Sequence, residues 1–251
     1  MSPLRIVIVD DEEPARNRLR ELLEDCRAEL PHQIVGEAAN GVEGLRTVAE
    51  GKADAVLVDI QMPEMSGMEF ARHLLVMEAP PAVIFVTAHD RYAVEAFEVN
   101  AVDYLTKPVR APRLLAALKK ALAGGRLPRG VLERIDPAPR RYLSVAERGR
   151  VTLVPVQEIV YLKAEQKYVT ACTRTRAYLV EESLAQLEQE FSGVFVRIHR
   201  NCLVARRLIR GFERTGETEG EIGWAVILEG RDERLPVSRR LWTQVKSLAA
   251  S

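Results

Sequence analysis

The chain has 251 residues, of which 47% are hydrophobic and 29% charged, and this composition is typical of a soluble protein whose length favours two domains. No stretch approaches the ~18 apolar residues of a membrane span, and the apolar run near the N-terminus ends in acids, unlike a signal peptide. Three cysteines without metal-type spacing argue against a disulfide framework or a zinc site, so we expect a reduced, cytoplasmic location.

The formal net charge of zero conceals two oppositely charged halves. Residues 1–123 hold 14 Lys and Arg against 20 Asp and Glu, a net charge of −6, and residues 124–251 hold 22 against 16, a net charge of +6. The first half is suited to bind a cation and the second a polyanion, although a salt-bridged interface between the halves would explain the same pattern.

The first half alternates between short apolar runs and helical patterns. Strand-length apolar runs lie at 4–10, 34–39, 53–59, 82–87 and 101–105. Helical spacing is found at 14–23, 41–49, 68–77, 92–97 and 112–122. Near-continuous apolar strands that alternate with helices predict an α/β domain over residues 1–123, a doubly wound, flavodoxin-like parallel sheet of five strands with helices on both faces.

The pattern changes after this region. Gly124, Gly125 and a stretch rich in Pro and Arg predict a linker over residues 124–141. Strand-like runs follow at 150–154, 159–164, 168–173, 177–180, 194–198, 203–205, 209–213, 221–228 and 234–237. Helical spacing is found only at 181–190 and 239–248. Residues 142–251 are therefore predicted to form a mostly-β domain.

Chemically active side chains follow four strands of the predicted parallel sheet. Asp10 and Asp11 end the first strand, Asp59 the third and Thr87 the fourth, and Lys107 comes after the fifth. In the strand order 2-1-3-4-5 these ends converge at one crevice. Each group alone is also typical of a helix cap or a loop. Together, three carboxylates suited to Mg²⁺, a hydroxyl and an ammonium indicate phosphoryl transfer onto an aspartate.

Several phrases of the first half resemble the receiver domain of two-component response regulators. They are Ile-Val-Ile-Val-Asp-Asp-Glu at 6–12, Val-Asp-Ile-Gln-Met-Pro-Glu-Met-Ser-Gly at 58–67, Thr87-Ala88 and Lys107-Pro108, and the resemblance covers residues 1–123. It implies that Asp59 accepts a phosphoryl group from the phosphohistidine of a sensor histidine kinase. It also implies a Mg²⁺ site formed by Asp11, Asp59 and the backbone carbonyl of Gln61, with Asp10 acting largely through water.

The same resemblance assigns the remaining parts of the receiver. Lys107 neutralises the phosphoryl oxygens, Thr87 donates a hydrogen bond to one of them, and Tyr104 is the aromatic that turns inward when Thr87 moves. The face formed by residues 90–97, 102–105 and 112–122 would pair two copies of the chain, so a homodimer is expected on activation.

The second half has no catalytic constellation, and His199 is its only histidine. Its segment Val-Arg-Ile-His-Arg-Asn-Cys-Leu-Val at 196–204 interleaves basic and apolar residues, and strand alternation would place Arg197 and His199 on one face and Val196 and Ile198 on the other. Basic residues also suit a solvated β surface, but the +6 balance and their clustering near turns favour contact with a nucleic acid.

Four phrases of the second half resemble the LytTR DNA-binding domain, over about residues 140–248. They are Glu-Ile-Val-Tyr-Leu-Lys-Ala-Glu-Gln-Lys-Tyr-Val at 158–169, Tyr-Leu-Val-Glu-Glu-Ser-Leu-Ala-Gln-Leu-Glu at 178–188, Phe-Val-Arg-Ile-His-Arg-Asn at 195–201 and Leu-Pro-Val-Ser-Arg-Arg at 235–240. Members of this family insert loops into successive major grooves of double-stranded DNA, usually at paired direct repeats. With the segments at 79–90 and 199–206, the chain as a whole most resembles the alginate-regulator branch of the family.

The resemblance divides the basic residues into two groups. The candidates for reading base edges are Lys167, Arg200, Asn201, Arg239 and Arg240. The candidates for phosphate contacts are Lys163, Arg197, Arg206 and Arg207. His199 is expected to form a structural hydrogen bond in its turn.

Two other functions are compatible with parts of the sequence. A Mg²⁺-dependent phosphohydrolase with an aspartyl nucleophile would usually carry Asp-x-Asp on its first strand, whereas Asp10 and Asp11 are adjacent and their side chains point apart. A protein-binding output domain without nucleic acid is disfavoured by the arginine clusters. The leading prediction is a transcription factor that is regulated by phosphorylation of Asp59 and dephosphorylates itself, rather than a turnover enzyme.

Overall fold

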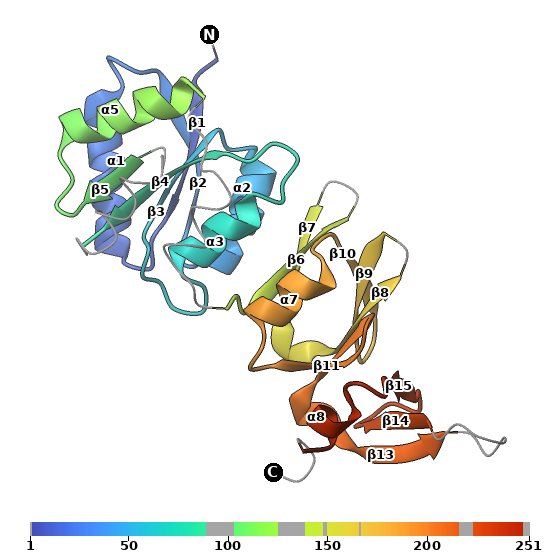
Figure 1. Cartoon of the computed structure of the whole chain (residues 1–251). Coiled ribbons are helices and arrows are strands. Elements are labelled where there is room, and N and C mark those ends of the chain that lie inside the picture. Colours follow the sequence, from blue (N-terminus) through green and yellow to red (C-terminus); the bar gives the residue numbers. More distant parts are fainter. Residues whose placement is uncertain are drawn as a thin grey trace. The chain divides into compact units, whose positions relative to one another are not determined.

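The computed structural model describes residues 2–88, 103–124, 139–147, 150–165, 167–215 and 223–247, and these form two compact units (Figure 1). The predicted helix at 92–97 and most of the predicted linker lie outside the described residues. Among the helices that the structure describes, none is long and apolar enough to cross a membrane.

The first unit is a five-stranded parallel sheet in the order β2-β1-β3-β4-β5. Its strands are β1 (Leu4–Val9), β2 (His32–Ala38), β3 (Ala55–Val58), β4 (Ala82–Thr87) and β5 (Asp103–Thr106). Its helices are α1 (Glu13–Cys26), α2 (Gly41–Gly51), α3 (Gly67–Leu74) and α5 (Ala111–Leu122). Helix α1 packs beside α5 and α2 beside α3, so helices cover both faces of the sheet (Figure 1). The predicted α/β class and strand order are confirmed.

The apolar runs of the sequence became strands because both faces of this sheet are covered. Ile6, Leu57 and Ile84, on three neighbouring strands, are fully buried against the layer of α1 and α5. Side chains alternate along a strand, so Val56 and Val58, also fully buried, face the opposite layer. A strand buried on both faces needs an apolar residue at every position, which explains runs without alternation.

Side-chain caps fix where two of the helices begin. Asn40 accepts a hydrogen bond from the backbone of Glu43 at the start of α2, and Ser66 accepts one from Glu69 at the start of α3. Helix α3 ends at Leu74, three residues before the predicted end at 77, and turns lead from there towards two prolines at 80 and 81, which lack the N–H that a helix needs.

A buried ion pair anchors α5 to the sheet. The carboxylate of Asp103, only 5% exposed, accepts a hydrogen bond of 2.7 Å from Arg113 and lies 3.1 Å from the ammonium of Lys120. Burial by itself would raise the pKa of this carboxyl, but the hydrogen bonds from Arg113, the backbone of Tyr104 and Lys120 hold it below its usual value. The pair therefore stabilises the fold in the ionised form.

Replacing Asp103 by asparagine is expected to lower the free energy of unfolding by about 1–2 kcal/mol at neutral pH. The effect is smaller than for a fully buried ion pair because the side chains of Arg113 and Lys120 are partly exposed to solvent. A lowered native pKa contributes stability above the unfolded pKa of about 3.9, and this is lost as the pH falls through the native pKa. Urea unfolding of the full chain should therefore show the full difference above about pH 5, and the difference should shrink as the pH falls below the unfolded pKa. Asp25→Asn, an exposed acid on α1, is the control, and a pH-independent difference would contradict the assignment.

The described residues from 142 to 247, which make up most of the second unit, form three antiparallel sheets: β6 pairs with β7, five strands run in the order β10-β9-β8-β12-β11, and β14 lies between β13 and β15. The strands are β6 (Tyr142–Glu147), β7 (Arg150–Pro155), β8 (Ile159–Glu165), β9 (Tyr168–Thr173), β10 (Ala177–Val180), β11 (Phe195–His199), β12 (Cys202–Ala205), β13 (Ile209–Thr215), β14 (Gly223–Leu228) and β15 (Leu235–Val237). The helices are α7 (Leu184–Glu190), α8 (Trp242–Ser247) and the short 3-10 turns η1 (Val156–Glu158) and η2 (Arg206–Leu208). The predicted mostly-β character is confirmed, while β6 and the two 3-10 turns were not predicted.

Each helix of this unit covers a sheet. Helix α7 contacts β8, β11 and β12 and buries Leu184 and Leu187 in the core. It starts at a capping box in which Ser183 and Gln186 satisfy each other's backbone N–H groups. Trp242 of α8 stacks on Trp224 of β14 with ring centroids 4.1 Å apart.

Candidate functional site

Three carboxylates converge at the carboxyl ends of β1 and β3. One oxygen each of Asp10, Asp11 and Asp59 lies within 4.8 Å of the others. The strands bring them together because β1 and β3 are parallel neighbours, and the backbone N–H of Asp59 donates to the carbonyl of Val9 at 2.9 Å. Asp10 is fully buried, Asp59 is 8% exposed and Asp11 is exposed.

The ammonium of Lys107 lies between two of these carboxylates. Its Nζ donates to Oδ2 of Asp59 at 2.7 Å and to Oδ2 of Asp10 at 2.9 Å. Burial opposes the charge of the lysine, but the two carboxylates outweigh it and raise the pKa of Lys107. Burial also raises the pKa of Asp10, although Lys107 and the backbone N–H of Glu12 act in the opposite direction. Lys107 therefore stays cationic and compensates part of the negative charge.

Thr87 and Tyr104 lie on the two strands next to these acids. Thr87 ends β4 with its side chain fully buried, and its carbonyl accepts a hydrogen bond of 2.8 Å from the backbone of Lys107. Tyr104 of β5, opposite Phe85 of β4, is only 6% exposed. The structure thus places Thr87 at the same end of the sheet as Lys107, and it buries Tyr104 within β5, two residues before that end.

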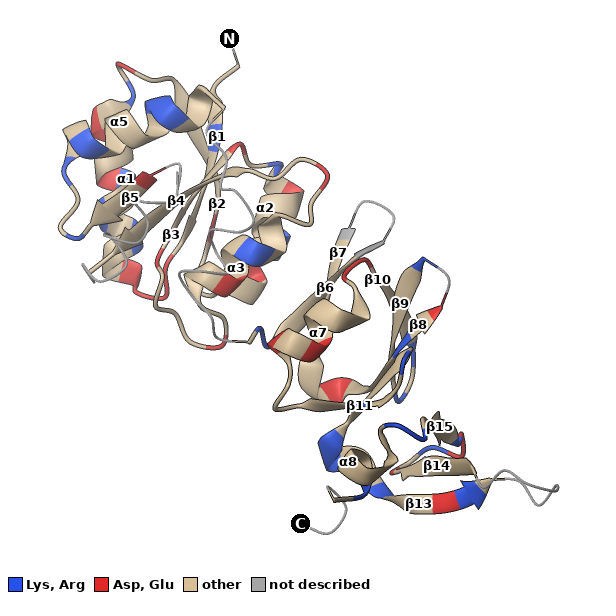
Figure 2. Ribbon diagram, in the orientation of Figure 1, with Lys and Arg blue, Asp and Glu red and all other residues tan. Residues whose placement is uncertain are grey.

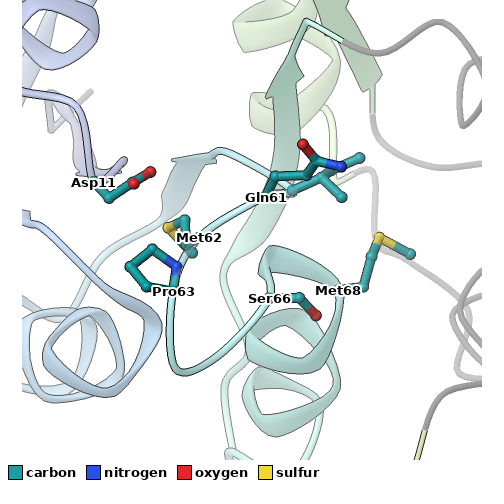
Figure 3. A pocket seen from close by; sticks show the side chains of 7 residues that line it. Asp11, Gln61, Met62, Pro63, Ser66 and Met68 are labelled. Carbon is teal, nitrogen blue, oxygen red and sulfur yellow. The ribbon is translucent and has the colours of Figure 1, made fainter.

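The loop between Asp59 and α3 borders an open pocket. Its lining residues are Asp11, Ile60, Gln61, Met62, Pro63, Ser66 and Met68. Figure 3 shows Asp11 facing the loop that carries Gln61, with Ser66 and Met68 at the start of α3. The backbone N–H of Gln61 donates to Oδ1 of Asp59 at 3.2 Å. Of the three acids, Asp11 therefore lines this opening, while Asp10 and Asp59 lie behind it, largely buried.

Two residues that sequence reasoning missed shape this site. A Cβ on Gly67 would lie 2.0 Å from the carbonyl oxygen of Asp59, so the loop folds back closely only because this residue is glycine. Arg16 of α1 donates to the carbonyl of Asp10 at 2.7 Å and lies 3.5 Å from Glu37. Each residue lies only six to eight positions from the aspartate whose carbonyl it approaches, but no spacing rule marks either contact, because both depend on how the loop or helix after the strand folds back.

The residues present fit a Mg²⁺ ion. The three carboxylates supply hard oxygen ligands that lie close to one another. The single ammonium of Lys107 contacts two of them and balances only one negative charge, so a buried excess of negative charge remains for a cation. An acidic pocket of this kind is where receiver domains generally bind Mg²⁺.

The base-reading candidates lie in three connections of the second unit. Lys167 is exposed between β8 and β9, and the turn between β11 and β12 holds the exposed Arg200 and the half-buried Asn201. Arg239 and Arg240 are exposed between β15 and α8. Figure 2 shows Lys and Arg residues on β8, β13 and near α8, and Asp and Glu residues on α7.

The phosphate candidates all contact other parts of the chain. Lys163 lies 2.7 Å from Glu165, and Nε of Arg206 donates to the carbonyl of Phe195 at 3.2 Å. Arg207 donates to the carbonyl of Gln157, and Arg197 pairs with Glu188. Among these four, Arg206 and Arg207 lie in the exposed turn η2, while the Arg197 side chain is only 18% exposed.

His199 contacts its own turn, because its Nδ1 forms a hydrogen bond with Oδ1 of Asn201. This agrees with the predicted structural hydrogen bond. It also occupies one of the two amide atoms through which Asn201 would pair with adenine.

A doubly wound sheet with acids and a lysine at its rim, joined to a mostly-β unit with basic turns, defines the class of receiver-containing regulators. Residues 6–119 match the family model of the response regulator receiver domain, and residues 149–250 match that of the LytTr DNA-binding domain. The chain belongs to the family of response regulators that combine a receiver with a LytTR DNA-binding domain.

Full-length relatives support this assignment. The chain is 42% identical over 255 residues to the positive alginate biosynthesis regulatory protein of Pseudomonas aeruginosa, with 98% of both chains covered. It is 30% identical over 248 residues to the sensory transduction protein LytT of Bacillus subtilis, again over 98% of both. A solved structure, the response regulatory domain of protein mrkE from Klebsiella pneumoniae, is 31% identical with a TM-score of 0.43 and covers 48% of this chain and 97% of its own. The predicted resemblance to the alginate-regulator branch is confirmed by the Pseudomonas relative.

Proposed function

We propose that the chain accepts a phosphoryl group from a sensor histidine kinase on Asp59 and responds by binding double-stranded DNA to control transcription in the cytoplasm. One observation carries this proposal. Lys107 Nζ contacts the carboxylates of both Asp59 and Asp10, and the carboxylate of Asp11 lies close to the same two acids. Membership of the receiver and LytTR families supplies the context, and the Pseudomonas relative is named as a positive regulator.

The site residues divide the chemistry between them. The carboxylate of Asp59 attacks phosphorus, the bond from phosphorus to the histidine nitrogen breaks, and an acyl phosphate forms. Lys107 neutralises charge on the phosphoryl oxygens, and the hydroxyl of Thr87 donates to one of them. Asp10, Asp11, Asp59 and the carbonyl of Gln61 would hold Mg²⁺, which when bound supplies further positive charge at those oxygens. Water later hydrolyses the acyl phosphate, which resets the regulator without turnover of a substrate.

We propose that phosphorylation strengthens DNA binding by causing two receiver domains to dimerise. Movement of Thr87 towards the phosphoryl group leaves space into which Tyr104 turns, and this changes the face that includes β5 and α5. Two receivers (residues 1–123) then pair, and the linker at 124–141 brings two DNA-binding domains (residues 142–251) onto paired direct repeats. Avidity makes such a pair bind much more tightly than one domain alone.

On the DNA, we propose that three turns read bases and that the exposed basic residues of η2 contact the phosphate backbone. Lys167, the Arg200–Asn201 turn and the Arg239–Arg240 pair would enter major grooves, where arginine bonds guanine through two donors. Exposed Arg206 and Arg207 would contact phosphates and contribute affinity without sequence preference.

The test is a DNA titration with and without a phosphoryl analogue. A duplex with paired repeats, selected from genomic fragments by the full chain itself, is titrated in Mg²⁺ with and without beryllofluoride. Beryllofluoride is expected to raise the affinity about tenfold, a coupling typical of two linked sites. Affinity should also fall steeply with salt. A duplex with one repeat is the control, and an affinity that responds neither to salt nor to beryllofluoride would overturn the proposal.

A further inference from the structure

The guanidinium of Arg197 is occupied within the chain. Its Nε and Nη2 donate to Oε2 of Glu188 at 3.0 and 2.6 Å, and its Nη1 donates to the backbone carbonyl of Arg200 at 2.9 Å. Each of the three nitrogens therefore uses one N–H group within the chain, and the side chain is only 18% exposed. A phosphate contact would require these donors to face solvent.

Glu188 belongs to a helix that is itself held firmly. Helix α7 buries Leu187 completely and begins at the capping box of Ser183. Both ends of the helix region are tied to Arg140, whose side chain is 9% exposed and lies 3.0 Å from Glu182 and 2.9 Å from Glu190. Arg197 consequently links a fixed helix to the turn between β11 and β12.

The backbone of that turn is held while one side chain is left to reach outwards. The carbonyl of Arg200 accepts from Arg197, and the carbonyl of Asn201 accepts from the backbone N–H of Ala164 at 2.8 Å. The contact between His199 and the Asn201 side chain closes the turn. The Arg200 side chain is exposed, and the described residues offer it neither a hydrogen bond nor an ion pair.

We propose that Arg197 and Glu188 are positioning residues that hold the Arg200–Asn201 turn in the orientation needed to read a major groove, and that Arg197 is not a phosphate contact. This inference rests on the proposed function, in which the turn reads bases. A turn that is ordered before binding loses less conformational freedom on the specific site, whereas non-specific binding to phosphates does not need that orientation.

The decisive variant is Glu188→Gln, because charge and positioning predict opposite effects. Removing an acid from a DNA-binding surface should by charge alone tighten binding to any DNA. Loosening the turn should instead weaken the specific duplex about tenfold, with binding to a scrambled duplex unchanged or slightly tighter. Glu181→Gln, an exposed acid just before α7, is the matched control and should not lose specificity. Tighter or unchanged specific binding by Glu188→Gln would overturn the inference.

Arg197→Lys provides an independent measurement. Lysine keeps the charge but cannot reach Glu188 and the carbonyl of Arg200 with the same rigid fork, so specificity should fall about as far as in Glu188→Gln, with the salt slope unchanged. A phosphate contact would instead keep most affinity as lysine. Arg206→Ala, which removes a proposed phosphate contact, should weaken both duplexes and reduce the salt slope by about one unit.

The outcomes separate this inference from the proposed function. Circular dichroism and thermal melting of each full-length variant establish that it is folded before it is titrated. If the wild-type chain shows no sequence preference, or Arg200→Ala retains it, the turn does not read DNA and the proposed function of the turn fails. If Arg200→Ala loses the preference while Glu188→Gln and Arg197→Lys keep it, the turn reads DNA without these two residues and only the inference fails.

Discussion

Replacing Asp59 by asparagine is expected to abolish phosphoryl uptake from a small donor such as acetyl phosphate in Mg²⁺, because an amide is not a nucleophile for phosphorus. The fold should survive. Asparagine keeps the size of the side chain, and it removes one of three carboxylates that repel one another around Lys107. Phosphoryl incorporation measured by mass spectrometry should fall to background, while the free energy of unfolding changes by less than about 1 kcal/mol.

Two further measurements test whether the effect is specific to Asp59 and whether the acidic site requires Mg²⁺. Asp25→Asn, which changes an exposed acid on α1, should keep full incorporation. Beryllofluoride should bind the wild-type chain only when Mg²⁺ is present, since the three carboxylates leave the anion without sufficient positive charge otherwise. Undiminished incorporation by Asp59→Asn would place the phosphoacceptor elsewhere.

Replacing Gly67 by alanine is expected to cost about 2–3 kcal/mol of stability and to lower phosphoryl uptake with it. The new Cβ would lie 2.0 Å from the carbonyl oxygen of Asp59 and 3.0 Å from the Cα of Ile60. Both are backbone atoms that cannot rotate away, so the loop after β3 must move and take the Asp59 carboxylate with it. Urea unfolding and acetyl phosphate labelling of the same samples measure both effects.

Gly193→Ala is the matched control for this substitution. A Cβ at Gly193 would meet no heavy atom within 4 Å, and the residue does not have the positive φ found at Gly124 and Gly230. Its stability should be unchanged or slightly higher, because alanine restricts the unfolded chain. If Gly67→Ala were as stable as Gly193→Ala and took up phosphoryl normally, the close approach would not shape the site.

The local sequence pattern was sufficient to predict strand limits where the structure depends on residues that are neighbours in sequence. The strand limits predicted at 82–87, 168–173 and 177–180 agree with β4, β9 and β10, because compact apolar or β-branched runs between breakers have one favourable structure. Strand β6 was missed because its segment, residues 142–147, mixes polar and apolar residues and depends on pairing with β7.

The acidic site could be predicted because topology converts strand ends into neighbours. Parallel strands that alternate with helices must place their carboxyl ends at one edge, so Asp10, Asp59 and Lys107 had to approach one another. Their separations, the burial of Asp10 and the closeness of Gly67 to Asp59 were not predictable, because these depend on how α3 and its loop pack against the sheet.

The basic residues show most clearly what the sequence could not determine without the tertiary structure. Composition and order of phrases were enough to indicate a DNA-binding domain, since net charge and family patterns are properties of the chain itself. The partner of each arginine is not such a property. Arg197 meets Glu188 on a helix nine residues earlier and is largely covered, whereas Arg206, although its Nε donates to the carbonyl of Phe195, lies in an exposed turn. A charge interacts with whatever the packed elements bring within a few ångströms, so folding determines which arginines are used inside the protein and which are left for DNA.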